Sequence, residues 1–117
     1  MKLLNWSFLR RRSEPKIVFG PGRLIRTDSI DVGILRLRSP LSRIGRALDN
    51  DICFDNDTVS GHHAEIYHLP DGTFQICDLN STNGTWVNGK AVRAKILADK
   101  DVLELGEVRL HFRTDKG

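Results

Sequence analysis

Three short clusters of polar residues and glycines are the parts of this sequence whose residue types are suited to binding a ligand. They are Ile44-Gly45-Arg46, the run from Val59 to Ile66, and the run from Asp78 to Gly89. Arg46 follows a glycine at the end of a short apolar run, and its planar guanidinium can pair with a phosphate or a carboxylate. Arg46 is therefore the first candidate binding residue.

The second and third clusters supply groups that complement this arginine. Ser60 and Thr82 carry hydroxyl groups, and the amide of Asn83 offers both donors and an acceptor. Gly61 and Gly84 permit close approach of the backbone and exposed N–H groups. Together these residues are suited to bind an anion while also holding the main chain of a peptide.

The same clusters lack the groups that catalysis or metal binding requires. The sequence contains no activated nucleophile beside a base, and no GxSxG, Walker or HExxH motif. His62 and His63 are adjacent, so in a strand they point to opposite faces and do not share one ion. We therefore predict no catalytic residue, no metal site, no cofactor and no enzyme activity.

Short strands are the elements that position these clusters. Gly and Pro interrupt the sequence often, and no long stretch keeps a helical apolar period. Val108, Leu110 and Phe112 alternate with polar residues, which is typical of a strand with one buried face. Many short strands of this kind predict an all-β sandwich or barrel. The predicted strands are Gly33–Arg38, Arg43–Gly45, Ile52–Phe54, His63–Leu69, Thr73–Asp78, Thr85–Val87, Val102–Leu105 and Val108–Arg113.

Two of the connections have the composition of tight turns. Pro70-Asp71-Gly72 joins two predicted strands, with a proline that presets φ and a glycine that tolerates positive φ. Asn88-Gly89 stands between Trp86-Val87 and Ala91-Val92, which predicts a hairpin with a type I′ turn. Both signals favour an antiparallel arrangement of neighbouring strands.

Charge is unevenly distributed along the chain. The formal net charge is +3, but residues 1–30 hold seven Lys/Arg against two acids, and the remainder hold eleven against thirteen. The body of the protein is thus weakly acidic. Because binding to a nucleic-acid backbone needs a basic surface, we expect no nucleic-acid partner.

The arm and the cysteines indicate the cellular setting. No apolar stretch approaches the roughly 20 residues of a transmembrane helix, so we expect no integral membrane segment and a cytoplasmic location. Residues 1–15 form a hydrophobic and basic arm, either an ordinary flexible or docked terminus or a peripheral contact for a membrane surface or partner. Cys53 and Cys77 lie in apolar runs without CxxC spacing, which favours two reduced, buried thiols over the alternative of a disulfide.

The three clusters in this order resemble the forkhead-associated (FHA) domain. The shared motifs are Gly-Arg at 45–46, Ser-x-x-His-Ala at 60–64 and Ser-x-Asn-Gly-Thr-x-Val-Asn-Gly at 81–89, and the likeness extends over about residues 30–113. The resemblance implies a sandwich of about eleven mostly antiparallel strands with recognition loops at one end, which bind a phosphothreonine peptide in extended form. We accordingly assign residues 16–114 to the domain and residues 1–15 to the arm.

The resemblance also implies roles for individual residues. Arg46 corresponds to the arginine that pairs with the phosphate, Ser60 and Thr82 to residues that hydrogen-bond it, and Asn83 to the asparagine that holds the ligand main chain. Thr58 corresponds to a position that helps to choose the residue three after the phosphothreonine. The structural support falls to Gly45, His63, Gly84, Asn88 and Gly89.

One position departs from the family pattern. Where the family often has Arg or another polar donor after the serine, this sequence has Gly61, whose backbone N–H is a partial replacement. The expected partners are a phosphothreonine-containing protein and, through it, a Ser/Thr kinase pathway. The alternative is an FHA module that joins a larger assembly independently of phosphate.

The N-terminal part of the chain beyond residues 1–15 offers a second source of ligand. Thr27-Asp28-Ser29-Ile30 has the form phosphothreonine-x-x-aliphatic, so this segment, once phosphorylated, is a candidate occupant of the protein's own pocket or a neighbour's. The alternative is that Thr27 is an ordinary strand or loop residue.

Overall fold

The protein is described by a computed structural model that covers residues 18–27 and 33–115. In these two ranges the chain forms eleven strands and no helix. The strands are β1 (Val18–Arg26), β2 (Gly33–Ser39), β3 (Leu41–Gly45), β4 (Ile52–Cys53), β5 (Ala64–His68), β6 (Phe74–Asp78), β7 (Thr85–Val87), β8 (Lys90–Val92), β9 (Ala94–Leu97), β10 (Val102–Leu105) and β11 (Val108–Thr114).

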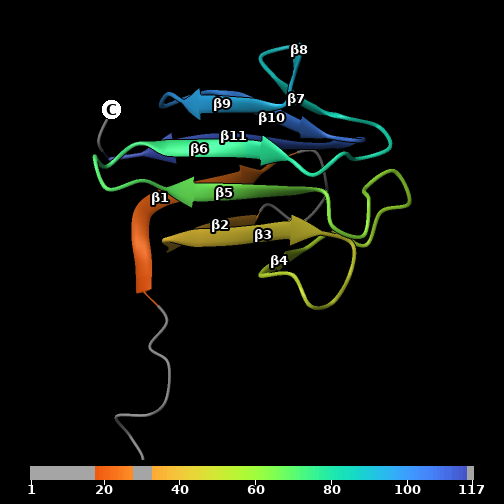
Figure 1. Ribbon diagram of the computed structural model, residues 1–117, viewed down its shortest axis with the longest axis horizontal. Helices are drawn as coiled ribbons and strands as arrows, with labels where there is room; N and C mark the ends of the chain where they lie inside the picture. Colours follow the sequence, from red (N-terminus) through yellow and green to blue (C-terminus); the bar gives the residue numbers. More distant parts are fainter. Residues whose placement is uncertain (1–17, 28–32, 116–117) are drawn as a thin grey trace, which may run out of the picture.

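The strands form two sheets that face each other (Figure 1). One sheet has the order β2-β1-β11-β10-β7-β8 and the other has the order β4-β3-β5-β6-β9. All strand pairs in the register are antiparallel except β3 with β4. The predicted β-sandwich is therefore confirmed, and its strand number is the eleven that the resemblance implied.

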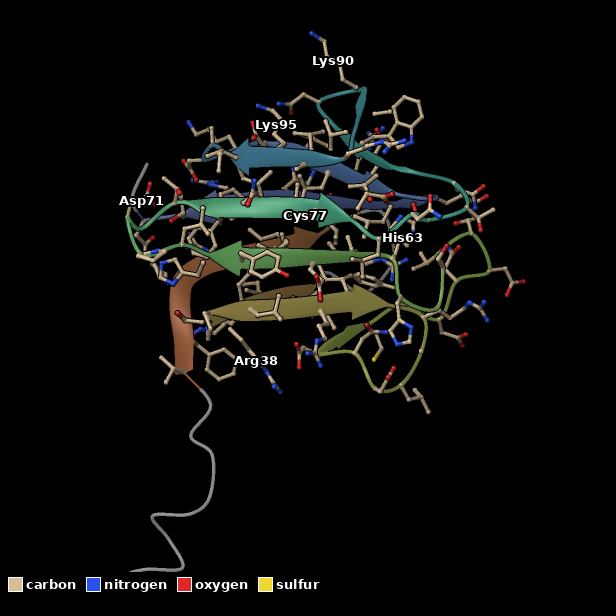
Figure 2. The ribbon with its side chains drawn as sticks, in the orientation of Figure 1. Arg38, His63, Asp71, Cys77, Lys90 and Lys95 are labelled. Atoms are coloured by element: carbon tan, nitrogen blue, oxygen red, sulfur yellow. The ribbon has the colours of Figure 1, made fainter. Side chains whose placement is uncertain are left out.

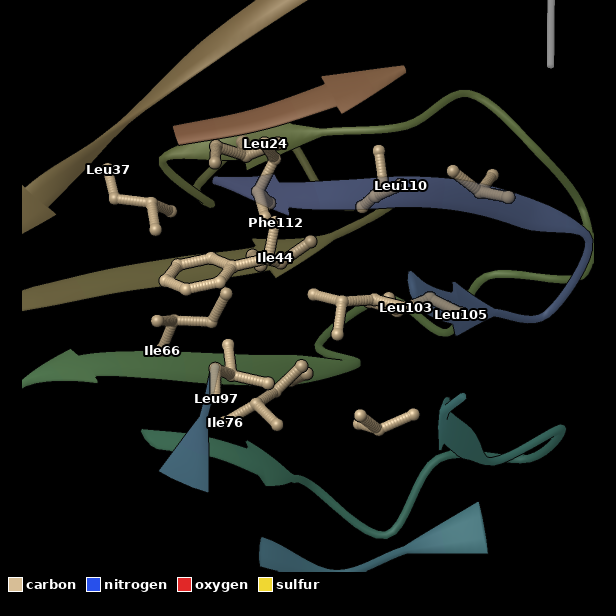
Figure 3. Packing of buried hydrophobic residues seen from close by; sticks show 14 of the residues in the cluster. Leu24, Leu37, Ile44, Ile66, Ile76, Leu97, Leu103, Leu105, Leu110 and Phe112 are labelled. Atoms are coloured by element: carbon tan, nitrogen blue, oxygen red, sulfur yellow. The ribbon is translucent and has the colours of Figure 1, made fainter. Parts of the chain in front are cut away.

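The core lies between the two sheets (Figure 3). Several strands, such as β5, β6, β10 and β11, place every second residue in this core, as β11 does with buried Val108, Leu110 and Phe112. Phe74 and Phe112 meet edge to face with 5.4 Å between ring centroids, which joins the two sheets directly. Burying one such side chain contributes roughly 1.5–3 kcal/mol to the stability of the fold. The shared core therefore holds the two sheets together.

The loops that carry the polar clusters meet at one end of the sandwich. In Figure 1 this is the right-hand end, where β3 and β6 end, β5 begins and β10 turns into β11. The Pro70-Asp71-Gly72 turn lies at the opposite end, and Gly72 N donates a 2.9 Å hydrogen bond to the carbonyl oxygen of Leu69. The separation leaves one end of the sandwich to the candidate site.

The structure confirms the predicted strands and adds three. All eight predicted runs contain a strand, with bounds that differ by two residues or fewer. The hairpin is confirmed too: Asn88 and Gly89 have φ of 50° and 82°, as a type I′ turn requires. The predictions missed β1 and β9 entirely and gave only the last two residues of β8.

The cysteines correct one expectation. Both are free thiols, but Cys53 is exposed and Cys77 is half-buried, so the prediction of two buried thiols was wrong. Ile52 turns inward from the short edge strand β4, so its neighbour Cys53 must face outward. Partial burial and the nearby Glu65 carboxylate raise the pKa of the Cys77 thiol.

Two expectations concern segments at the edges of this structure. Residues 1–15, and three of the four residues in Thr27-Asp28-Ser29-Ile30, lie outside the described residues; only Thr27 is described, and it is exposed. Within the described part of the chain, no helix has the length and apolar character needed to cross a membrane.

Candidate functional site

Arg46 is the first residue after β3, and its backbone is held against the second cluster. Arg46 N donates a 2.9 Å hydrogen bond to the carbonyl oxygen of Ser60. The preceding residue must be glycine, because a Cβ on Gly45 would lie 2.2 Å from the carbonyl oxygen of Gly61. The Arg46 side chain donates from Nε to the carbonyl oxygen of Val59 at 3.0 Å. The residue remains exposed, so the guanidinium is anchored at Nε and presents its terminal nitrogens to solvent.

Ser60 links the second cluster to the third. Its hydroxyl oxygen accepts a 3.0 Å hydrogen bond from the backbone N–H of Thr82. On the other side, Gly61 accepts hydrogen bonds from Ala47 N at 3.0 Å and from Asn50 Nδ2 at 2.8 Å through its carbonyl oxygen. The loop of Arg46, the loop of Ser60 and the loop of Thr82 are thus in direct contact.

His63 lies beneath these loops and is fully buried (Figure 2). Its Nδ1 accepts a 3.0 Å hydrogen bond from Ser60 N, so the ring proton belongs on Nε2, which donates to the carbonyl oxygen of Gly84 at 2.9 Å. The backbone of His63 also bonds to Ile44 and Leu79. One imidazole therefore joins the Ser60 loop to the loop that ends at Gly84.

Asn83 and Thr58 form the far side of the site. Asn83 Nδ2 donates a 2.8 Å hydrogen bond to the carbonyl oxygen of Thr58. The Thr58 hydroxyl donates to Asn56 Oδ1 at 2.6 Å and accepts from Glu107 N at 2.8 Å. The Asn83 amide keeps its second N–H and its carbonyl oxygen for other partners, because the bond to Thr58 uses one of its four positions.

Asp78 is the first residue of the third cluster, and its carboxylate accepts hydrogen bonds from other residues of that cluster. Oδ1 accepts from the Ser81 hydroxyl at 2.5 Å and the Thr85 hydroxyl at 2.7 Å, and Oδ2 accepts from Ser81 N at 3.1 Å. Burial raises the pKa of this carboxyl, but the hydrogen bonds from Ser81 and Thr85 outweigh it, so the pKa lies below its ordinary value. The ionised form is therefore the one that shapes the loop.

Asn88 and Gly89 do not share this cluster of contacts. Asn88 Nδ2 donates to Asp101 Oδ1 at 2.9 Å, and Asn88 Oδ1 accepts from Val102 N at 2.9 Å. These bonds attach the β7–β8 hairpin to β10. Asn88 and Gly89 therefore support the sheet next to the site.

The two adjacent histidines face different surroundings. His62 is exposed and its Nε2 lies 3.0 Å from Asp49 Oδ1, whereas His63 is buried. The hydrogen bond from His62 lowers the pKa of the Asp49 carboxyl. Among residues 18–27 and 33–115, no three His, Cys, Asp or Glu side chains gather as a metal site would need.

Sequence reasoning missed several residues that shape this site. Asn56 had a readable signal, because its Oδ1 accepts from Thr58 N two residues later, as in an Asx-turn. Asn50 had none, since its Nδ2 bonds to Gly61 eleven residues away. Asp78 begins the third cluster, but its bonds to Ser81 and Thr85 were not predicted. Glu107 is brought to Thr58 from 49 residues away, which only the fold reveals.

The fold and the site together define a β-sandwich recognition domain with its binding loops at one end. Comparison with known families gives this class a name: the FHA domain matches residues 42–106, which is more than half of the chain. The chain belongs to the FHA domain family.

Curated relatives share the same region. The glycogen accumulation regulator GarA of Mycolicibacterium smegmatis is 44% identical over 78 residues, which is 67% of this chain and 49% of that protein. The oxoglutarate dehydrogenase inhibitor of Corynebacterium diphtheriae is 38% identical over 76 residues, which is 65% of this chain and 52% of that protein. The chain thus spans about half the length of these relatives.

Solved structures agree with the fold. A structure from a study of phosphothreonine-dependent FHA domain interactions matches with a TM-score of 0.73 at 33% identity, covering 80% of this chain and 96% of that one. The FhaA FHA domain in complex with the intracellular domain of Rv3910 matches with a TM-score of 0.71 at 34% identity, covering 78% and 99%.

Proposed function

We propose that this domain binds a phosphothreonine-containing segment of a partner protein through Arg46, Ser60, Thr82 and Asn83. The observation that carries the proposal is the placement of the exposed Arg46 guanidinium. Its Nε is fixed on Val59, next to Ser60, and the Ser60 hydroxyl is in turn bonded to Thr82 N. A guanidinium fixed next to Ser60, whose hydroxyl joins its loop to the backbone of Thr82, is suited to receive a phosphate.

The phosphate supplies most of the binding energy in this mechanism. It carries a charge of about −1.5 to −2 at neutral pH and accepts hydrogen bonds on three oxygens. Each charge-assisted hydrogen bond contributes roughly 1.5–3 kcal/mol, while association and ordering consume much of the sum. A micromolar dissociation constant, about −8 kcal/mol, is the expected result.

Asn83 and a small apolar contact add selectivity. The second N–H and the carbonyl oxygen of the Asn83 amide are the groups that hold the ligand main chain. Threonine is preferred to serine because its γ-methyl adds apolar contact between the loops. This preference is supported by the likeness to a structure studied for phosphothreonine-dependent interactions.

The relatives indicate the biological setting. Their names describe a regulator and an inhibitor of metabolism, and the match with this chain spans about half the length of each of them. The proposal is therefore a regulatory protein-interaction module in the cytoplasm that responds to a Ser/Thr kinase. None of the four proposed binding residues makes or breaks a covalent bond in this role.

Arg46→Ala tests the proposal. We expect the phosphopeptide affinity of the variant to fall by at least about tenfold, because one charge-assisted interaction is removed. Titration calorimetry with paired phosphorylated and unphosphorylated peptides is the measurement. Arg43→Ala is the matched control, since Arg43 is an exposed arginine within β3, three residues before Arg46.

Three results would decide the matter. Retained binding in Arg46→Ala, with an unchanged melting temperature, would remove Arg46 from the pocket. Equal binding of phosphorylated and unphosphorylated peptides by the unaltered protein would instead favour the phosphate-independent module that the Gly61 departure suggests. Loss of binding in Arg43→Ala as well would point to a general charge effect.

A further inference from the structure

The Thr58 hydroxyl is already committed within the protein. Its single proton is donated to Asn56 Oδ1 at 2.6 Å, and its oxygen accepts from Glu107 N at 2.8 Å. A hydroxyl has one proton to give, so Thr58 has none for a ligand. Thr58 can therefore act on a neighbouring ligand side chain only as an acceptor, and a second group on this side of the site is needed to select by charge.

The β10–β11 turn supplies that group. Gly106 has φ of 58°, and a Cβ there would lie 2.4 Å from the carbonyl oxygen of Thr58, so the turn is packed directly on this residue. Glu107 follows, with its backbone fixed to Thr58 and its side chain exposed. The Glu107 side chain is therefore exposed to solvent on a turn whose backbone is bonded to Thr58.

Glu107 is also close to the residue that holds the ligand main chain. The Thr58 carbonyl oxygen accepts the 2.8 Å bond from Asn83 Nδ2, while the Thr58 hydroxyl accepts the bond from Glu107 N. Asn83 and Glu107 are thus joined through a single residue. A peptide that is held at Asn83 and extends past Thr58 would pass next to Glu107.

The charge of this end of the molecule indicates which side chain that is. Arg46 is the only Lys or Arg in the loops 46–51, 54–63, 79–84 and 106–107, and Arg26 of β1 adds one more guanidinium 5.4 Å from the ring centroid of Phe54. Two of the acids there have partners within the protein, since Asp49 contacts the His62 ring and Asp51 pairs with Arg38. Asp55, Asp57 and Glu107 are exposed, and no ion pair to a described residue is found for them.

A ligand that brings only a phosphate meets this acidic rim unfavourably. The rim repels the phosphate outside its immediate contact with Arg46, whereas a cationic side chain beside the phosphothreonine is attracted to it. We infer that Glu107 is a specificity-determining residue that favours phosphopeptides with Lys or Arg on the flank that passes Thr58. The inference rests on the proposed function, of which it specifies the ligand class.

A charge reversal at Glu107 tests it. Phosphothreonine peptide libraries, degenerate on both sides of the phosphothreonine, are screened against the unaltered protein, Glu107→Gln and Glu107→Lys. Pairs of single peptides with Lys or Glu at the selected position are then titrated. Asp115→Lys is the control of equal charge change, because Asp115 is exposed and follows β11 at the end of the sandwich opposite the loops.

We expect the unaltered protein to bind the Lys peptide about three- to tenfold more tightly than the Glu peptide, with a difference that shrinks at high salt. Glu107→Gln should reduce the preference, and Glu107→Lys should reverse it. Asp115→Lys should leave it unchanged. Thermal unfolding verifies that the variants fold, which is expected because the Glu107 contact uses the backbone.

Two results overturn the inference, and they differ. Phosphate-dependent binding without a flanking charge preference, or a preference retained in Glu107→Lys, overturns the role of Glu107 alone. Absence of phosphate-dependent binding to every library overturns the proposed function and this inference with it.

Discussion

Ser60 shows how one hydroxyl can both build a site and serve it. Its oxygen accepts a hydrogen bond from Thr82 N, which joins two loops before any ligand arrives. Because an acceptor position is used and the proton is not, the O–H remains able to donate to a phosphate oxygen. The contact that shapes the pocket and the contact that would hold the phosphate thus use different parts of the same group.

His63→Ala tests whether the buried imidazole supports these loops. The change leaves Ser60 N and the carbonyl oxygen of Gly84 without their partners and opens a cavity. We expect a loss of about 2 kcal/mol or more in the free energy of unfolding, measured by urea denaturation. His62→Ala is the control, because that side chain is exposed; equal stability of the two variants would refute a supporting role for His63.

Gly61→Arg tests the departure from the family pattern. A Cβ at Gly61 meets only the Ala47 Cβ at 4.0 Å, and no positive φ is found there, so the backbone accepts a side chain. The new guanidinium stands next to Ser60, where a phosphate would gain a charge-assisted contact. We expect phosphopeptide affinity to rise about tenfold in calorimetric titration. Lowered or unchanged affinity would place Gly61 outside the phosphate contact.

The candidate site could be predicted from the sequence only as far as its residues are close in the chain or part of a recurrent motif. Arg46, Ser60 and Asn83 stand in such motifs, and the structure brings their loops together. Asn50 and Glu107 reach the site through contacts eleven and 49 residues away in sequence. Such contacts depend on strand register, which no local pattern determines.

At the scale of elements, the composition of β1 explains why this strand was not predicted from the sequence. It contains Gly20-Pro21-Gly22, which in sequence is typical of a break. In the fold, a Cβ on Gly22 would lie 2.7 Å from the Phe74 ring and one on Gly20 2.9 Å from His68. The glycines let β1 pass close to the stacked His68 and Phe74 rings, whose centroids are 4.4 Å apart.

The edge strand β9 was missed for a different reason, which is that its own residues show no strand pattern. Three of its four residues are exposed, so the alternation that identifies a half-buried strand is absent. It exists because its backbone pairs with β6. A strand defined by its neighbour rather than by its own side chains cannot be found from its own sequence.

The β6–β7 connection depends on the ionised Asp78 carboxylate, which gives a pH prediction. Hydrogen bonds from Ser81 and Thr85 outweigh the effect of burial and lower the pKa of Asp78 in the folded state. Stability from this group is therefore fully present above the unfolded value of about 3.9 and is lost as pH falls through the folded value. Asp78→Asn should be less stable than the unaltered protein at pH 7, and the gap should close toward pH 2.

Urea unfolding at several pH values between 7 and 2 measures this gap. Asp115→Asn removes an exposed carboxylate and is the control. Asp71 and Asp99 also have a lowered pKa, Asp71 through hydrogen bonds from Thr73 and Asp99 through a bond from Thr114 N, so acid still destabilises the variant. A gap that stays constant with pH would show that the charge of Asp78 is not what holds the loop.

At the scale of the whole molecule, the sandwich separates stability from recognition. The buried residues of both sheets form one cluster, while the candidate binding residues lie in loops beyond the strand ends. Changes in such loops alter binding with little effect on the core. The all-β class could be predicted from short runs and turns, whereas the division of eleven strands between two sheets follows from pairings distant in sequence.

Removal of residues 1–15 tests the predicted boundary between arm and domain. Within the described residues, the strands of both sheets run from Val18 to Thr114, so we expect the free energy of unfolding to change by less than about 0.5 kcal/mol. The deletion also takes four Lys/Arg and one acid, which lowers the formal net charge from +3 to zero. Because long-range attraction is screened by salt, phosphopeptide affinity should match that of the full chain at physiological ionic strength and differ only at low salt. Chemical denaturation and calorimetric titration at two salt concentrations measure both. A loss of more than 2 kcal/mol in stability would assign the arm to the fold, and a salt-independent change in affinity would assign it to the binding site.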